Sequence, residues 1–286
     1  MNLPASRVSL SSPPTTRSVR NRMGWLLIAV LPGIAGRVRE AGVGLLLQLA
    51  LALGFALLVD ALLLRVHGQL LRAARFEGST AVTAVLFALC LPMLAPWWVI
   101  ALGIGAALVF GQFLYGGLGR NPFHPAMLGI ALLLVCLPGT WAPVAPTSHL
   151  PGDHAWIRIA ALDALGGAWL VWLRIVRWQT PLAVLAGAAL GAALLGFAAH
   201  APTLRELFAG NLVLAAFFIA SDPVSGCVTP LGRWVFGLGV GLLLVLLQRI
   251  GTLSIGLPFA VLLMNGAAPW IDRRMQPARL AEQPHG

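Results

Sequence analysis

Asp222 lies in an apolar stretch of the chain, where an ionised carboxylate needs a partner or a task. The run reads Ala220-Ser221-Asp222-Pro223-Val224-Ser225. In lipid, a charged side chain at a helix centre costs roughly 2.5 to 3.5 kcal/mol. Pro223 lacks a backbone N–H and disfavours helix at Asp222, which frees carbonyl oxygens beside the carboxylate. These groups suit a cation site, although the carboxylate is equally suited to cap the helix that follows.

A second cluster of unusual residues is the run from Tyr115 to Met127, YGGLGRNPFHPAM. Its three Gly and two Pro exclude a continuous helix. Asn121 before Pro122 predicts a helix N-cap with Pro at the first helical position. The glycine backbone can line a flavin, a quinone or an ion path, and a simple tight turn is the alternative.

These runs supply the candidate site residues. Asp222, Asn121 and Asn265 are polar residues beside helix breaks in both parts of the chain, and we assign them to an ion path. Asn121, Phe123 and His124 are the candidate cofactor contacts. We assign no catalytic residue, because HExxH, GxSxG, P-loop and GxGxxG-acidic patterns do not occur in the sequence.

Other reactive residue types give weaker signals. Asp163 is five residues from Arg158 near a predicted outer surface, which indicates a structural role. The three cysteines, Cys90, Cys136 and Cys227, are far apart without CxxC spacing, so the sequence predicts apolar packing rather than a metal centre. Most of the six histidines fall in loops or tails, which disfavours a haem held by two of them.

The composition identifies the environment of these residues. Of the 286 residues, 59% are hydrophobic and 10% are charged, whereas a soluble domain has about 25% charged residues. This balance excludes a soluble globule, a disordered chain, a nucleic-acid-binding protein and a disulfide scaffold. The sequence predicts an all-α polytopic membrane protein with about ten helices. The predicted spans cover residues 23–36, 42–64, 80–95, 97–115, 124–139, 158–176, 180–199, 207–221, 232–249 and 256–272.

All nineteen basic residues are Arg, and their distribution predicts the orientation. Four of them precede the first span, which places the N-terminus in the cytoplasm. Alternating sides then puts fourteen Arg inside and five outside. The expected organisation is a cytoplasmic polar tail over 1–22, one transmembrane domain over 23–272 and a cytoplasmic tail over 273–286. No cleavable signal peptide is recognised.

The chain also contains an internal repeat. Residues 98–123 align without gaps on residues 234–259, with ten identities in twenty-six positions. The two segments belong to the fourth and ninth spans, which cross in opposite directions. We therefore expect two inverted five-helix repeats, over about 23–139 and 158–272, with broken helices near Pro92, Pro122, Pro223 and Pro258 and a site between the halves. The paired glycines 103/105 and 239/241 predict close helix contacts.

Several segments resemble a known family. They are LPGIA at 31–35, LAPWW at 94–98, the YGGLGRNPFHPAM run, FFIASDPVS at 217–225, and FAVLLMN at 259–265 with PWID at 269–272. In this order they resemble the RnfD/NqrB family, whose members are membrane subunits of the Rnf electron-transport complex and of the sodium-translocating NADH:quinone oxidoreductase. The resemblance covers about nine-tenths of the chain.

The resemblance implies a function, cofactors and partners. It implies a subunit of a bacterial inner-membrane complex that couples electron transfer, of the ferredoxin or NADH type, to Na⁺ or H⁺ translocation. The implied partners are other membrane subunits and iron–sulfur and flavin subunits, with no nucleic acid. Family members carry FMN on a Thr of an S-G-A-T-like motif, and some also hold riboflavin without a covalent bond.

The chain departs from this family in two places. Only sixteen residues, Ala142 to Ile157, stand where the family has the longer outer loop with that Thr. Thr147 does not match the motif, and Trp169 occupies the Thr position of a similar run, Leu165-Gly166-Gly167-Ala168-Trp169. We therefore expect no covalent FMN, whereas a non-covalent flavin stays open. His124 stands where the family commonly has Asn.

Two other functions fit the same residues. An inverted repeat with Pro-broken helices also suits a channel or transporter for a small solute. Small-residue packing surfaces and the short outer loop suit a scaffold subunit without redox function in the same complex.

Overall fold

Helices form all the regular secondary structure in the described part of the computed structural model, which comprises residues 16–66, 78–92, 95–115, 121–137, 154–196, 211–250 and 253–275. This confirms the all-α prediction. The elements are α1 (Thr16–Ala41), α2 (Val43–Val66), α4 (Gly78–Cys90), α5 (Trp97–Gly111), the 3₁₀-helix η1 (Phe113–Tyr115), α6 (Pro125–Cys136), α7 (Ala155–Trp172), α8 (Gln179–Gly196), α10 (Leu212–Leu214), the π-helix η2 (Ala215–Ile219), α11 (Pro230–Ile250) and α12 (Leu253–Met275).

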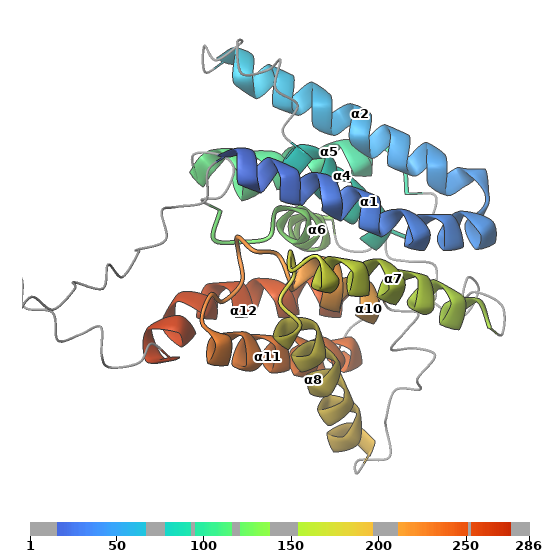
Figure 1. Ribbon diagram of the computed structural model, residues 1–286. Helices are drawn as coiled ribbons and strands as arrows, with labels where there is room; N and C mark the ends of the chain where they lie inside the picture. The colour runs from blue at the N-terminus through green and yellow to red at the C-terminus, as the bar shows by residue number, and fades with distance from the viewer. Residues whose placement is uncertain are drawn as a thin grey trace, which may run out of the picture.

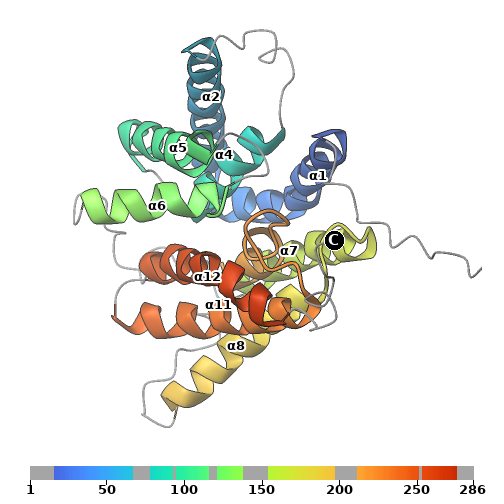
Figure 2. The same ribbon diagram turned by 90° about the vertical axis from the view of Figure 1, so that its left-hand side faces the viewer.

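The helices are arranged as two stacked halves, α1 to α6 and α7 to α12 (Figure 1). The helices α2 and α8 lie at opposite outer edges, while α1 and α6 face α7 and α12 (Figures 1 and 2). Neighbours within each half also correspond: α5 packs on α2 and α6, and α11 packs on α8 and α12. This shared packing supports the predicted duplication.

The first helices of the two halves run in opposite directions. Gly33 of α1 lies against Asp163 of α7, Gly36 lies against Ile159, and Ala29 lies against Gly166. As residue numbers rise along α1, the facing numbers fall along α7. Because α1 and α7 occupy equivalent positions in the two halves, the repeat is inverted, as predicted.

The helices differ in their capacity to span a bilayer. Among the described residues, five segments are long and apolar enough to do so, namely Val43–Val66, Trp97–Tyr115, Ala155–Trp172, Gln179–Gly196 and Pro230–Gln248. By contrast, α4 and α6 have 13 and 12 residues and rise only about 20 Å at 1.5 Å per residue. The element α10 continues directly into the five-residue π-helix η2. These short elements lie beside Pro92, Pro122 and Pro223, which confirms the breaks predicted there.

The break predicted at Pro258 is wrong, because Pro258 lies inside α12. It is the sixth residue of that helix. A proline removes the hydrogen bond to the carbonyl four residues earlier, which here belongs to the first turn, so the helix continues past it.

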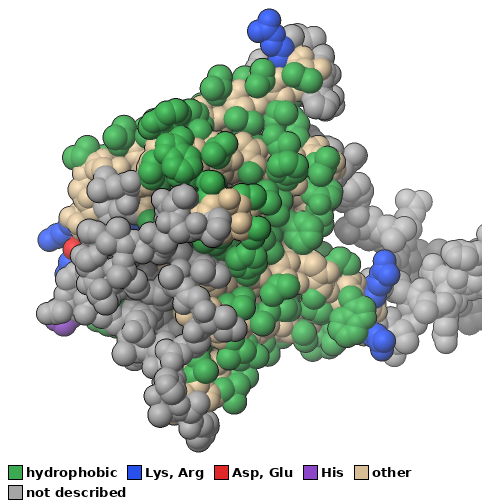
Figure 3. Space-filling view, turned by 180° about the vertical axis from the view of Figure 1, so that it is seen from behind, with side chains coloured by type: hydrophobic (Ala, Val, Ile, Leu, Met, Phe, Trp, Pro, Cys, Tyr) green, Lys and Arg blue, Asp and Glu red, His purple; other side chains and the backbone are tan. Residues whose placement is uncertain are grey.

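The outer surface fits a multi-pass membrane protein. Large hydrophobic side chains such as Leu47, Leu58 and Trp172 are exposed. Figure 3 shows hydrophobic side chains over the middle of one face and Arg side chains at its edges. Exposed apolar area on this scale is unfavourable in water and favourable against lipid.

Small residues allow the close helix contacts that the repeat predicted, with one exception. A Cβ at Gly103 would overlap Phe87, one at Gly239 would press on Met264, and one at Gly241 would overlap the carbonyl oxygen of Val184. Gly105 has open space around its Cβ position, so the prediction is wrong for that residue.

Candidate functional site

The short elements meet around a polar cavity between the halves. The cavity measures about 30 Å³. Its polar lining comes from α4, from the segment before α6 and from the loop after η2. The lining residues are Met23, Leu26, Ser79, Val82, Thr83, Asn121, His124, Pro125, Phe218, Asp222 and Val224. Two of the three predicted ion-path residues, Asn121 and Asp222, therefore line one cavity.

Asp222 is held by its own loop. The backbone N–H of Val224 donates to Oδ1 at 3.4 Å, and the backbone N–H and hydroxyl of Ser225 donate to Oδ2 at 3.3 and 2.8 Å. The hydroxyl of Ser221 donates to the Ala216 carbonyl at 2.6 Å and covers the end of η2. Pro223 cannot extend the helix, so the chain turns here and the carboxylate faces the cavity.

The alternative role of Asp222, a cap for the following helix, is wrong. The helix α11 begins only at Pro230. Its first turn is capped by Thr229, whose hydroxyl accepts from the backbone N–H of Gly232 at 3.1 Å. Asp272 of α12 in turn accepts from the Thr229 hydroxyl at 2.6 Å. Asp222 thus caps the short turn at 223–225, through the backbone N–H groups of Val224 and Ser225, and not the helix α11.

Asn265 joins the two halves next to the cavity. With the amide oriented to match its neighbours, its nitrogen donates to the Ser225 carbonyl at 3.1 Å and its oxygen accepts from the backbone N–H of His124 at 3.0 Å. Asn265 is only 2% exposed. Ser225 also donates to Asp222, so Asn265 is one residue removed from the carboxylate. All three predicted ion-path residues therefore belong to one polar cluster.

The segment before α6 differs from its prediction in register. Pro125, rather than Pro122, occupies the first helical position, and His124 is the N-cap. Asn121 does not cap a helix; its Nδ2 donates to the Phe123 carbonyl at 3.0 Å. A proline at the first helical position is the sequence signal for a helix start. Pro122 and Pro125 both match that signal, and the sequence alone did not show that the helix begins at Pro125. Gly116 to Arg120 lie outside the described residues.

Three further polar residues at the site were missed from the sequence. Ser79 and Thr83 are buried on α4 and line the cavity one turn apart, and Ser225 holds Asp222. Hydroxyl side chains at positions i and i+4 at the start of an apolar span were the available signal.

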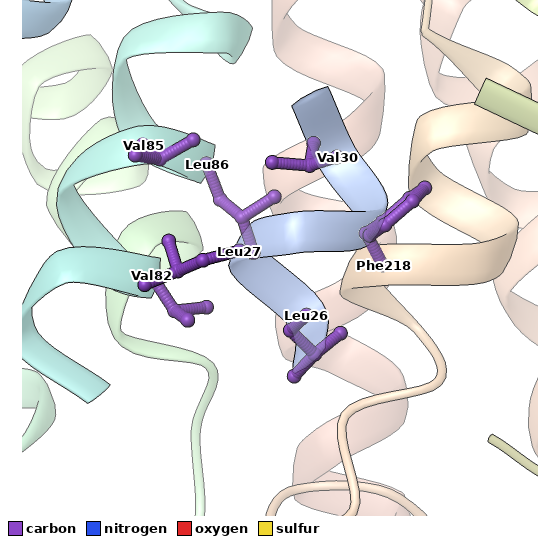
Figure 4. Close-up of a pocket in the computed structure, with 7 residues that line it drawn as sticks. All are labelled: Leu26, Leu27, Val30, Val82, Val85, Leu86 and Phe218. Carbon is purple, nitrogen blue, oxygen red and sulfur yellow. The ribbon is translucent and has the colours of Figure 1, made fainter. Parts of the chain in front are cut away.

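An apolar pocket of about 10 Å³ adjoins the polar cavity and shares Leu26, Val82 and Phe218 with it. Figure 4 shows this pocket between side chains of α1 and α4, with Phe218 at its side. All of its lining residues are hydrophobic. The cavity that Asp222 lines is therefore bordered by hydrophobic side chains on this side.

Asp163, which is buried, has a different environment from the half-buried Asp222. Asp163 accepts from Nη1 and Nη2 of Arg37 at 2.8 and 2.7 Å. Nη2 of Arg37 also donates to Asn211 at 2.9 Å, and Asn211 donates to the Leu89 carbonyl at 3.4 Å. The predicted partner of Asp163, Arg158, instead pairs with Glu40. Asp163 is structural, as predicted, but its partner is a different arginine.

The cavity beside Asp222 is too small for a cofactor. The cavity that Asn121 and His124 line measures about 30 Å³, roughly a tenth of the smallest usual ligand pocket, so it fits water or a small ion rather than a flavin ring. Phe123 is not among its lining residues. Trp169 lies 6.5 Å from Trp25, ring centre to ring centre. A Cβ at Gly166 would overlap the Ala29 carbonyl, so this run serves helix packing. Thr147 lies outside the described residues.

Metal ligands are likewise not gathered in the described ranges, where no three His, Cys, Asp or Glu side chains form a group. Cys227 is buried and its thiol lies 3.7 Å from the Ala268 carbonyl. Cys90 is half-buried and Cys136 is exposed. The packing role predicted from the sequence therefore fits Cys227 best.

Comparison with known proteins gives a consistent set of relatives. Residues 10–154 and 148–281 match the model of the NQR2, RnfD, RnfE family. RnfD of Sodalis glossinidius, a component of an ion-translocating oxidoreductase complex, is 33% identical, with 94% of this chain and 97% of that protein covered. The protein of the same name from Pseudomonas aeruginosa is 37% identical, with 89% and 90% covered.

The relatives are longer than this chain. The alignment with the Sodalis protein runs over 336 positions, which exceeds the 286 residues of this chain by 50. That relative therefore has at least 50 positions at which this chain has no residue. On the match to the family model and the identity over most of both sequences, the chain belongs to the NQR2, RnfD, RnfE family.

Proposed function

We propose that this chain is a membrane subunit of an ion-translocating oxidoreductase complex, and that Asp222, Asn121 and Asn265 line the path of the ion. The observation that carries the proposal is their convergence in one polar cluster between the inverted halves, in which Asn121 and Asn265 are buried and Asp222 is half-buried. Broken helices at the interface of inverted repeats are where transporters bind their ions. The names of the relatives supply the class of complex.

The orientation proposed from the arginines is also part of this account. We place both termini on the cytoplasmic side of the inner membrane. Arg37, Arg158 and Glu40 then lie together on the outer side, since α1 ends where α7 begins. Arg65 and Arg273 lie in the last turns of α2 and α12, on the inner side.

We further propose that the chain holds no covalent flavin. The supporting observations are the short outer loop and the position of Trp169 in a packed helix contact. A flavin bound to another subunit of the complex would supply electron transfer. In that case this chain contacts the other subunits and provides the polar groups that line the path of the ion.

Purification of the assembly tests the class of function. We expect the tagged chain to copurify from membranes with iron–sulfur and flavin subunits, and the reconstituted assembly to move ions only while it transfers electrons. Solute flux by the isolated chain would indicate a transporter instead. Ion movement that persists in an assembly lacking this chain would indicate a scaffold.

A matched pair of amide variants tests the ion path. Asn265→Ala removes the link between His124 and Ser225, and we expect the number of ions moved per electron to fall severalfold. Gln48→Ala is the control, because Gln48 is also a buried amide but donates to the Ala88 carbonyl, at 2.8 Å on α4, outside the cavity lining. An equal ratio in both variants contradicts the proposed path.

The flavin proposal predicts an absence on a denaturing gel. We expect no acid-resistant flavin fluorescence in the band of this chain, because the described residues and the short outer loop offer no matching Thr. A neighbouring flavin subunit on the same gel is the positive control. A fluorescent band at 30.1 kDa that is lost in Thr147→Ala would overturn the proposal.

A further inference from the structure

His124 is a buried histidine with an unused ring nitrogen at the cavity. The side chain is 4% exposed, and Nδ1 has no hydrogen-bond partner among the described residues. A buried polar atom without a partner costs about 1 to 3 kcal/mol. Such an atom therefore points to a ligand, and the ligand here must fit a cavity of about 30 Å³.

The cavity has room for water. A polar space needs about 10 to 15 Å³ for one water molecule, with two to four polar partners. Ser79, Thr83, Asn121, His124 and Asp222 supply such partners within one lining. A water there can contact the imidazole and the carboxylate together.

Asp222 and His124 are the two titratable groups in the described lining. The remainder consists of the hydroxyls of Ser79 and Thr83, the amide of Asn121 and apolar side chains from α1, α4, α6, η2 and the loop after η2. Asn265 of α12 contacts the His124 backbone and is not ionisable. The carboxylate is the single acidic group that faces the imidazole from these elements.

We propose that His124 and Asp222 form a water-bridged proton pair, so that the ion bound in this cavity is a proton. This inference rests on the proposed ion path and specifies its ion. An imidazole nitrogen is a poor ligand for a hard alkali cation, which prefers oxygen. An imidazole, by contrast, is a side chain that can bind and release a proton.

The exchange conserves atoms and charge. An N–H bond of the His124 imidazolium breaks as the bridging water takes that proton. The same water gives one of its own protons to a carboxylate oxygen of Asp222. The products are neutral imidazole, neutral carboxylic acid and an intact water molecule, and the reverse transfer restores the ion pair.

Nitrogen NMR of the purified full-length chain tests the pair without need of transport. With ¹⁵N-labelled histidine, His124 is assigned from His124→Asn, and its signal is followed from pH 5 to 8. In Asp222→Asn we expect the imidazolium form to appear about one pH unit lower, because an attractive charge is lost. His154, exposed before α7, is the internal control. An unchanged His124 titration overturns the pair.

Two further measurements test the pair if the Asp222→Asn variant fails to fold or if the complex transports an ion other than the proton. In the unmodified chain, we expect magnetisation transfer between water and the His124 imidazole; its absence contradicts a hydrated cavity. In the reconstituted complex, we expect His124→Asn to lower proton movement per electron about tenfold. If the complex moves sodium and His124→Asn leaves that movement unchanged, the proton pair is overturned while the proposed ion path stands. If the unmodified complex moves no ion at all, the proposed function is overturned instead.

Discussion

Asp163 and Asp222 are both acids inside an apolar bundle, yet their surroundings differ. Asp163 is 2% exposed and receives two hydrogen bonds from Arg37. Asp222 has no ion-pair partner among the described residues and faces a cavity together with His124. The charge of Asp163 is fully balanced by Arg37. The carboxylate of Asp222 can still accept a further partner, as a residue that binds an ion must.

The cluster around Asp163 and the cluster around Asp222 also differ in the elements that they connect. Arg37 and Asp163 link α1 to α7, and Asn211 extends this link to the carbonyl at Leu89 on α4. This outer cluster fixes helices against one another. The Asp222 cluster instead lies among short elements and loops, where small rearrangements cost fewer helix contacts.

The largest effect should come from breaking the outer ion pair. Arg37→Ala leaves the Asp163 carboxylate buried without a cation, and removal of one partner of a buried pair costs about 3 to 5 kcal/mol. Chemical unfolding in detergent measures the loss. The double variant Arg37→Met with Asp163→Leu removes both charges and should recover most of the stability; an Arg37→Ala chain as stable as the unmodified one contradicts the assignment.

A smaller loss is expected from Asn211→Ala. This change removes one acceptor for Arg37 and one donor to Leu89. It also places Ala at a backbone φ of +62°, which Asn tolerates better than Ala. We expect a cost of about 1 to 3 kcal/mol in the same unfolding measurement. Asn211→Gly separates the two causes, because it relieves the backbone term alone.

The smallest effect on stability is expected at Asp222. Asn in place of Asp222 keeps an oxygen acceptor for the Ser225 hydroxyl, so Asp222→Asn should cost about 1 kcal/mol or less. Glu40→Gln, which affects an exposed ion pair with Arg158, serves as the matched control. A loss as large as that of Arg37→Ala would make Asp222 structural and remove the contrast between the two acids.

Much of the fold followed from the sequence, because periodic apolar runs and proline breaks are local signals. Most spans lie within a few residues of the helices, but α1 begins at Thr16, seven residues before its predicted span and inside the predicted polar tail 1–22. The span 207–221 contains only the short α10 and η2 among its described residues. The inverted repeat was readable from residues such as Trp98/Trp234 and Gln112/Gln248. The continuous helix through Pro258 was not, because the cost of a proline depends on its distance from the helix start.

The site was predicted by residue type and completed by long-range contacts. Asp222, Asn121 and Asn265 were identified by their position beside breaks, and they do share one cluster. Arg37 as partner of Asp163 was not predictable, since the two residues are 126 positions apart. Ser79 and Thr83 were missed because their role depends on which face of α4 meets the loop after η2.

The most direct test of the central claim is the ratio of ions moved to electrons transferred by the reconstituted complex with Asp222→Asn. The account predicts that electron transfer continues while the ratio falls about tenfold. Glu40→Gln should keep the ratio of the unmodified complex. An unchanged ratio in an assembled, active complex with Asp222→Asn would contradict the account.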